Sequence, residues 1–144
     1  MDKTIRHRIQ EWHGFIEENG IGGRLFGEPV DYFVDTLKKA YEIAIAALND
    51  GLWQPERVIC TTFTAAMGLR RALHEKHLNT GSDVRICAVG GEDWGEYLTP
   101  SLTSVTQPDL NKLINRALNM LEHDDHENAL LKPEKIEIFI GESS

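Results

Sequence analysis

Apolar residues recur at helical spacing in several stretches of the chain. In residues 4–19 the spacing follows a period of about 3.6 residues, with the apolar positions at Ile5, Ile9, Trp12 and Ile16. Similar stripes, together with capping residues, predict helices over 4–19, over 31–49 with Asp31 as N-cap, over 64–77, and over 110–121 opened by Pro108.

Short runs rich in β-branched residues lie between these helices and predict strands over 57–62, 84–89, 102–105 and 135–140. Strands that alternate with helices are typical of βαβ units. We therefore predict a single α/β domain over residues 1–144, with a parallel sheet covered by helices on both faces. Ligands of such sheets bind beyond the carboxyl ends of the strands, which points to residues 61–63 and 90–93.

Composition narrows the class of protein. The 144 residues are 41% hydrophobic and 26% charged, which excludes a disordered or collagenous chain. The net charge of −8, without a basic cluster, argues against nucleic-acid contact by this chain alone. No apolar run approaches the roughly 20 residues that span a bilayer, and no signal peptide is evident. We expect a cytoplasmic protein with no membrane contact, whose Cys60 and Cys87 are buried thiols.

The sequence offers no clear cofactor or metal motif. Residues 90–95 follow a strand and are rich in glycine, but they match neither nucleotide-binding pattern and lack a lysine for phosphate. His74 and His77 are three residues apart, whereas zincin histidines are four apart. Residues 123–127 read as a charged surface loop. We expect no cofactor and no metal.

Catalytic constellations are also lacking. No Ser-His-Asp or Cys-His spacing stands out, and Glu92 and Asp93 are adjacent, so on an extended strand end their side chains point apart. We expect a protein that is not an enzyme. Arg6 or Arg8, near the start of the first helix, could hold an anionic or polyhydroxyl ligand, or either could form a surface ion pair.

Several segments, read in order, resemble the effector-binding core of LacI/GalR-type transcriptional regulators. Residues 8–21 resemble the family's Arg-x-x-Gly-aromatic helix, which ends in Gly-Ile, and residues 65–75 its Ala-x-Gly-x-x-x-Ala-Leu helix. Residues 83–93 resemble the strand that ends in Val-Gly-aromatic-Asp-Asp, and residues 99–108 the Pro-Pro-Leu-Thr-Thr-Val-x-Gln-Pro crossover. Order and spacing agree across nearly the whole chain.

The resemblance implies the C-terminal lobe of a periplasmic-binding-protein-like fold. It also implies that the chain is an excised fragment or a truncated product without the N-terminal lobe and the helix-turn-helix head that binds DNA. Residues 108–131 resemble a segment that packs in that other lobe. Family members dimerise partly through the C-terminal lobe, so a homodimer is expected.

The resemblance also implies an effector site at Arg8, Thr62, Phe63, Glu92 and Asp93. Arg8 matches the arginine that contacts the effector, which is typically a sugar or a sugar derivative. Glu92 stands where an aspartate is usual, and the extra methylene displaces its carboxylate. Thr62 and Phe63 belong to a segment that usually carries an acid. These departures count against an ordinary sugar contact.

Three functions therefore remain open from the sequence. The first is the effector-sensing part of a transcriptional repressor. Because this chain would supply only one of the two lobes that form the ligand cleft, we expect it to bind effector weakly or not at all. The second is an interaction module that has lost effector binding and self-associates through a sheet edge or the helix at 110–121. The third, a small α/β enzyme, needs a nucleophile or a metal site that the sequence does not show.

Overall fold

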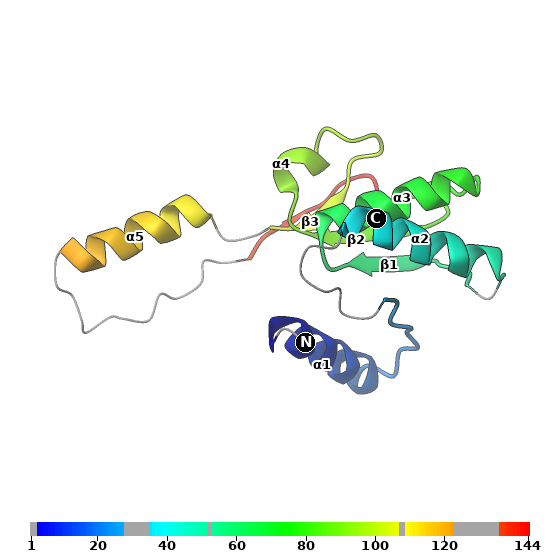
Figure 1. The fold of residues 1–144 in the computed structure, drawn as a ribbon, viewed down its shortest axis with the longest axis horizontal. Coiled ribbons are helices and arrows are strands. Elements are labelled where there is room, and N and C mark those ends of the chain that lie inside the picture. Colours follow the sequence, from blue (N-terminus) through cyan, green and yellow to red (C-terminus); the bar gives the residue numbers. More distant parts are fainter. Residues whose placement is uncertain (1–2, 28–34, 52, 107–108, 123–135) are drawn as a thin grey trace.

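The computed structural model describes residues 3–27, 35–51, 53–106, 109–122 and 136–144. Its helices are α1 (Lys3–Glu18), α2 (Thr36–Asn49), α3 (Phe63–Glu75), α4 (Glu92–Gly95) and α5 (Leu110–Glu122). Its strands are β1 (Arg57–Cys60), β2 (Arg85–Val89), β3 (Thr103–Val105) and β4 (Ile138–Phe139). The predicted helices and strands occur in the predicted order, with boundaries shifted by a few residues, and the short α4 is an additional helix (Figure 1).

The start of α2 differs from the prediction. Asp35 is the N-cap, because its side chain accepts hydrogen bonds from the backbone N–H groups of Leu37 and Lys38. Such a bond satisfies donors that the first turn leaves without partners. The predicted N-cap Asp31 lies outside the described residues, and so does the predicted helix opener Pro108.

The four strands form one sheet in the order β1-β2-β3-β4. The pairs β1–β2 and β2–β3 are parallel, as predicted, whereas β3–β4 is antiparallel. Beyond the ladder, Thr106 extends the antiparallel pair: its backbone N–H donates to the carbonyl of Glu137, and its hydroxyl accepts from the Glu137 N–H. The last strand therefore reverses the direction that the simple βαβ pattern implies.

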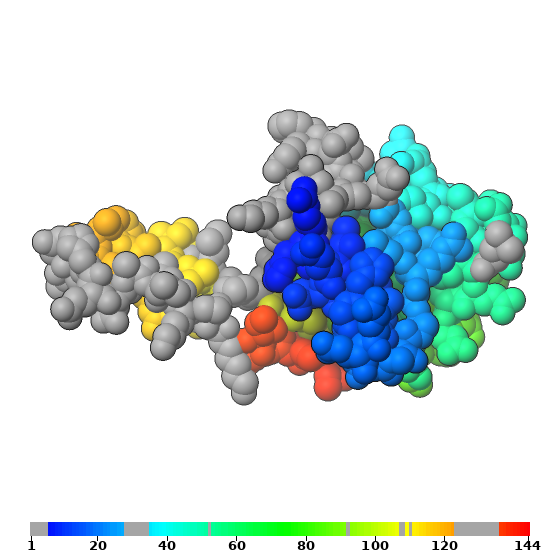
Figure 2. Space-filling model, turned by 90° about the horizontal axis from the view of Figure 1, so that it is seen from below, coloured from blue at the N-terminus to red at the C-terminus, as the bar shows by residue number. Residues whose placement is uncertain are grey.

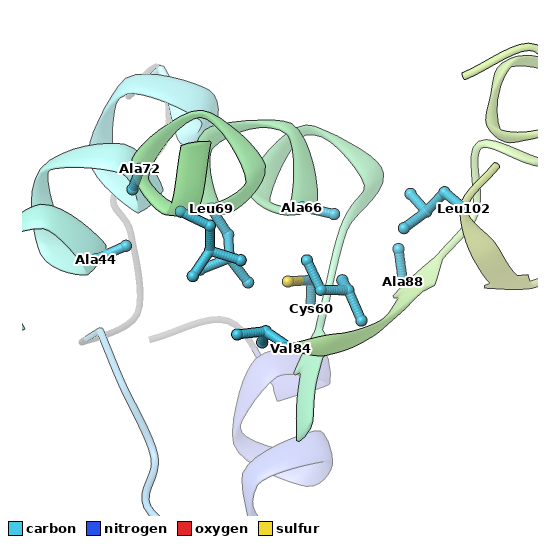
Figure 3. Close-up of a cluster of buried hydrophobic side chains, with 10 residues drawn as sticks. Ala44, Cys60, Ala66, Leu69, Ala72, Val84, Ala88 and Leu102 are labelled. Atoms are coloured by element: carbon cyan, nitrogen blue, oxygen red, sulfur yellow. The ribbon is translucent and has the colours of Figure 1, made fainter. Parts of the chain in front are cut away.

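The core lies between the sheet and the α2–α3 pair. Figure 3 shows side chains from α3 pointing toward those of β1 and β2, and the buried cluster comprises Ala44, Cys60, Ala66, Leu69, Ala72, Leu73, Val84, Ile86, Ala88 and Leu102. Small residues let the two helices approach closely. A Cβ atom on Gly68 would lie 2.2 Å from the carbonyl oxygen of Leu37, so this position of α3 admits only glycine.

The contact between α2 and α3 ends in a polar cluster. Tyr41 donates its hydroxyl hydrogen to Glu75 at 2.8 Å, and Arg71 donates to the same carboxylate at 2.8 Å. These bonds, led by the one from Tyr41, lower the pKa of the Glu75 carboxyl. The ionised carboxylate thus links the two helices at the surface.

The opposite face of the sheet is less covered. Helix α1 lies on the other side of β1 from α2 and α3 (Figure 1), yet Ile59 on β1 is 62% exposed. The side chains of Ile136, Ile138 and Ile140 are also solvent-exposed. Of the two predicted helical layers, the one formed by α2 and α3 therefore carries most of the packing within the described part of the chain.

The chain's last residues close the sheet at the amino ends of β2 and β3. Ser143 is fully buried. Its hydroxyl donates to the carbonyl of Ile86 and accepts from the backbone N–H of Thr103, each at 2.8 Å. Its backbone carbonyl accepts from the Ile86 N–H at 2.7 Å. The C-terminus is therefore an integral part of the sheet.

Helix α5 stands apart from the rest of the fold. Figure 2 shows it, in yellow and orange, extending away from the body of the molecule. Asp109 caps it by accepting from the N–H groups of Asn111 and Lys112. Its apolar stripe remains exposed, most strongly at Leu121, which is 79% accessible.

Candidate functional site

The carboxyl ends of β1 and β2 lie next to each other because the two strands are parallel neighbours. Thr62 follows β1 and is the N-cap of α3, accepting a hydrogen bond from the Ala65 N–H at 3.1 Å. Phe63 packs directly on Gly91, where an added Cβ would lie 2.0 Å from the Phe63 ring. The two strand-end segments that the sequence singles out therefore touch.

Glycine is required at position 91 for two reasons. The residue has φ +82°, a left-handed conformation that costs other residues energy, and the ring of Phe63 leaves no room for a side chain. Gly91 precedes α4, whose first residue is Glu92. This turn carries the chain from β2 to Asp93.

Asp93 lines a cavity of about 610 Å³ beside α4. The other lining residues are Glu96, Tyr97, Thr106, Glu137, Ile138 and Phe139. A volume of this size suits a small molecule. Its carboxylates and aromatic rings offer hydrogen-bond acceptors and flat apolar surfaces, which suit a polyhydroxyl or cationic ligand better than an anion.

Of these lining residues, only Asp93 is among the site residues predicted from the sequence. Glu137 and Phe139 are distant along the chain and reach the cavity because β4 pairs antiparallel with β3. Tyr97, 80% exposed, follows α4 as a surface aromatic. Its position could have been predicted from the sequence, because Tyr97 is an aromatic residue shortly after the end of a strand, where ligands of α/β sheets bind.

Arg8 forms no hydrogen bond or ion pair with the strand-end residues Thr62, Phe63 and Asp93 among the described residues. It lies on α1 with an exposed side chain. The structure thus places the two strand-end segments side by side, whereas Arg8 lies on α1, with no hydrogen bond or ion pair to these residues in the described part of the chain.

The candidate metal ligands and the two cysteines do not form a metal or catalytic site within the described residues. Among the described residues no cluster of three or more His, Cys, Asp or Glu side chains could hold a metal ion; the predicted surface loop at 123–127 lies outside them. Cys60 and Cys87 are both free. Burial raises the pKa of the Cys60 thiol to about 12, so this thiol is a poor nucleophile.

None of the described helices combines the length and the apolar character needed to cross a membrane.

The fold is an α/β domain with a ligand-sized cavity near the carboxyl ends of the parallel strands. The family model for the periplasmic binding protein-like domain matches residues 2–144, and the chain belongs to that family. The family and fold predicted from the sequence are confirmed.

Solved structures with the same fold are transcription regulators. The regulator CcpA of Lactococcus lactis is 22% identical with a TM-score of 0.76, covering 99% of this chain and 52% of that one. A PurR family regulator from Vibrio parahaemolyticus is 20% identical with a TM-score of 0.76, covering 98% and 50%. A LacI family regulator from an Arthrobacter species, in complex with lactose, is 20% identical with a TM-score of 0.70, covering 92% and 49%.

The chain spans about half the length of the solved chains that it matches. Among curated protein sequences, no relative matches.

Proposed function

We propose that this chain is the effector-sensing part of a LacI/GalR-type transcriptional regulator, acting in the cytoplasm as a binding module and not as an enzyme. DNA binding would belong to a helix-turn-helix segment outside these residues, and the chain itself would make no nucleic-acid contact. The effector would be a small polyhydroxyl molecule, a sugar or a sugar derivative.

The observation that carries this proposal is the contact between Phe63 and Gly91. It places the two strand-end segments side by side, and Asp93, two residues after Gly91, lines the cavity beside α4. The regulator from Arthrobacter, which shares the fold, holds lactose. In this chain Thr62 and Asp93 offer polar groups for a ligand, and Phe63 offers an apolar surface on which a sugar ring could stack.

In a complete regulator the effector would close two lobes and shift the DNA-binding segment between two states. Such a shift requires different contacts with the effector in the two states. Arg8, on the separate helix α1, would reach the effector only in an arrangement that brings α1 toward the strand ends.

An amide NMR titration of this chain with a panel of sugars and sugar phosphates tests the proposal. We expect small, saturable shifts at Thr62, Phe63 and Gly91–Asp93, with affinity weaker than micromolar because half a cleft offers half the contacts. Asp93→Asn should weaken binding, whereas Asp83→Asn, at the other edge of the sheet, should not. Shifts confined to other residues, or none with any sugar, would contradict the effector assignment, and micromolar binding would contradict the half-cleft reasoning.

A second candidate role, self-association, rests on the exposed apolar stripe of α5. Its members Ile114, Leu118 and Leu121 lie on one helix face and are about half exposed or more. A second copy of this chain is the occupant we favour, because a two-fold axis pairs such a stripe with itself. One solved lac repressor with the same fold is described as dimeric.

Sedimentation velocity distinguishes this role from that of a monomeric sensor. We expect a dimer at tens of micromolar and a shift to monomer on Leu118→Glu, which places a charge in the stripe. The control Lys112→Glu, on the polar side of α5, should leave the dimer intact. A monomer throughout this concentration range would remove self-association of this chain from consideration.

A further inference from the structure

A second cavity, of about 700 Å³, opens at the opposite edge of the sheet from the candidate effector site. Its walls come from the C-terminal half of α3, from the turn before β2, and from the residues that precede β3 and follow β4. The polar side chains in its walls include Arg70, Arg71, Asn79 and Glu142. Neither the family match nor the proposed effector site assigns it a role.

Arg70 carries a positive charge that the described residues do not neutralise. Its Nη2 donates to the carbonyl oxygen of Thr99 at 2.9 Å. Its Nη1 is buried, and no described residue offers it an acceptor. No carboxylate in the described residues forms an ion pair with it, and burial lowers the pKa of its guanidinium. A buried donor without an acceptor is rare in folded proteins.

The neighbouring arginine is different. Arg71 binds Glu75 through both Nη2, at 2.6 Å, and Nε, at 2.8 Å. Its charge is therefore already compensated within the helix. Of the two arginines at the cavity wall, Arg70 is the one whose charge is available to a ligand.

The carboxylate in the cavity wall is engaged elsewhere. Oε2 of Glu142 accepts hydrogen bonds from the backbone N–H of Ser101 at 2.9 Å and from its hydroxyl at 3.3 Å. The side-chain amide of Asn79 donates to Asp83 at 3.0 Å. These bonds hold the walls in place, and the cavity offers a half-buried guanidinium in a chain whose net charge is −8.

We propose that this cavity binds a small molecule with a phosphate or carboxylate group, held by Arg70. The charge of the guanidinium attracts both kinds of oxyanion, and its partial burial strengthens a charge-assisted hydrogen bond. The cavity volume lies in the range of small-molecule sites. Because this site lies at the other edge of the sheet, it is a second site in addition to the effector site.

The test is an amide NMR titration of the chain with inorganic phosphate and, separately, with succinate, at constant ionic strength set with sodium chloride. We expect saturable shifts at the last turn of α3 and at residues 79–80, with millimolar affinity, for at least one of the two anions. Phosphate alone would identify a phosphate ester as the ligand class, and succinate alone a carboxylate. No saturable shift there with either anion overturns the proposal.

Variants separate a specific site from general attraction of anions. Arg70→Gln should weaken binding about five-fold or more, whereas Arg116→Gln, an exposed position on α5, should not change it. Equal loss in both variants overturns the proposal. If Arg70→Gln does not fold, the side-chain Nε–H resonances of the unmodified protein decide: that of Arg70 should shift on addition of the anion and that of Arg116 should not, and equal shifts overturn the proposal.

Discussion

Replacing Ser143 by alanine should destabilise the fold, although the change removes a single oxygen atom near the end of the chain. Ser143 is 0% exposed, and its hydroxyl is at once donor to the Ile86 carbonyl and acceptor for the Thr103 N–H. These bonds join β2 and β3 at their amino ends. We therefore expect Ser143→Ala to loosen this edge of the sheet.

The magnitude follows from the two lost partners. The Thr103 N–H would remain buried without an acceptor, which costs about 1–3 kcal/mol, and the Ile86 carbonyl would lose a bond worth about 0.5–1.5 kcal/mol. We expect a total of about 1.5–4.5 kcal/mol, against a stability of roughly 5–15 kcal/mol for a domain. The corresponding fall in Tm is about 3–18 °C, at about 2–4 °C per kcal/mol for a domain of this size.

Urea unfolding followed by tryptophan fluorescence, with thermal unfolding by circular dichroism, measures the loss. Ser82→Ala, at an exposed position in the turn before β2, is the matched control and should change the unfolding free energy by less than about 0.5 kcal/mol. If Ser143→Ala is as stable as this control, the two hydrogen bonds do not hold the sheet edge and the reasoning fails.

Three further experiments test the packing of α2 against α3, the burial of Cys60 and the ionisation of Glu75. Gly68→Ala should lower the unfolding free energy by at least about 2 kcal/mol, because its Cβ would clash with the α2 backbone, whereas Gly14→Ala, with open space around it, should leave the urea midpoint the same or higher. In the native protein at pH 8, mass spectrometry after iodoacetamide should show Cys87 alkylated well before Cys60, whose pKa of about 12 reflects its burial; equal rates would contradict the burial. The lowered pKa of Glu75 stabilises the fold above the ordinary glutamate pKa and ceases to do so as the pH falls through the folded value. Tm should therefore fall more steeply between pH 6 and pH 3 in the native protein than in the Glu75→Gln variant. Parallel curves would show that ionised Glu75 does not stabilise the fold.

Local patterns in the sequence were enough to find most helices and strands. The apolar spacing of α3, with Ala66, Leu69, Ala72 and Leu73 on one face, reappears as the buried face of that helix. Parallel pairing of β1 with β2 followed from the helix between them, because a strand that must cross over a sheet through a helix returns in the same direction. The strand-end segments at Thr62, Phe63 and Asp93 could be proposed for the same reason.

The resemblance to a regulator family supplied what periodicity could not. No pattern of spacing alone distinguishes an effector-binding lobe from another α/β domain. The ordered motifs pointed to the family, and the family match over residues 2–144 confirms the family. The choice of Arg8, Thr62, Phe63, Glu92 and Asp93 as effector ligands stays a prediction.

Features that depend on distant segments were beyond the sequence. The antiparallel β4 brings Glu137 and Phe139 to the cavity beside α4, and nothing in residues 136–140 indicates the direction in which that strand pairs. The uncompensated charge of Arg70 likewise depends on which groups surround it after folding.

The sequence by itself determined most of the elements, their order and the parallel pairing of β1, β2 and β3, because helical and strand periodicity act over neighbouring residues. Only the tertiary structure decided which polar groups find partners. Ser143 is buried between strands that lie far from it along the chain, while the stripe of α5 stays in solvent. Burial and hydrogen bonding are properties of the three-dimensional neighbourhood, and two residues with similar local patterns can end in opposite environments.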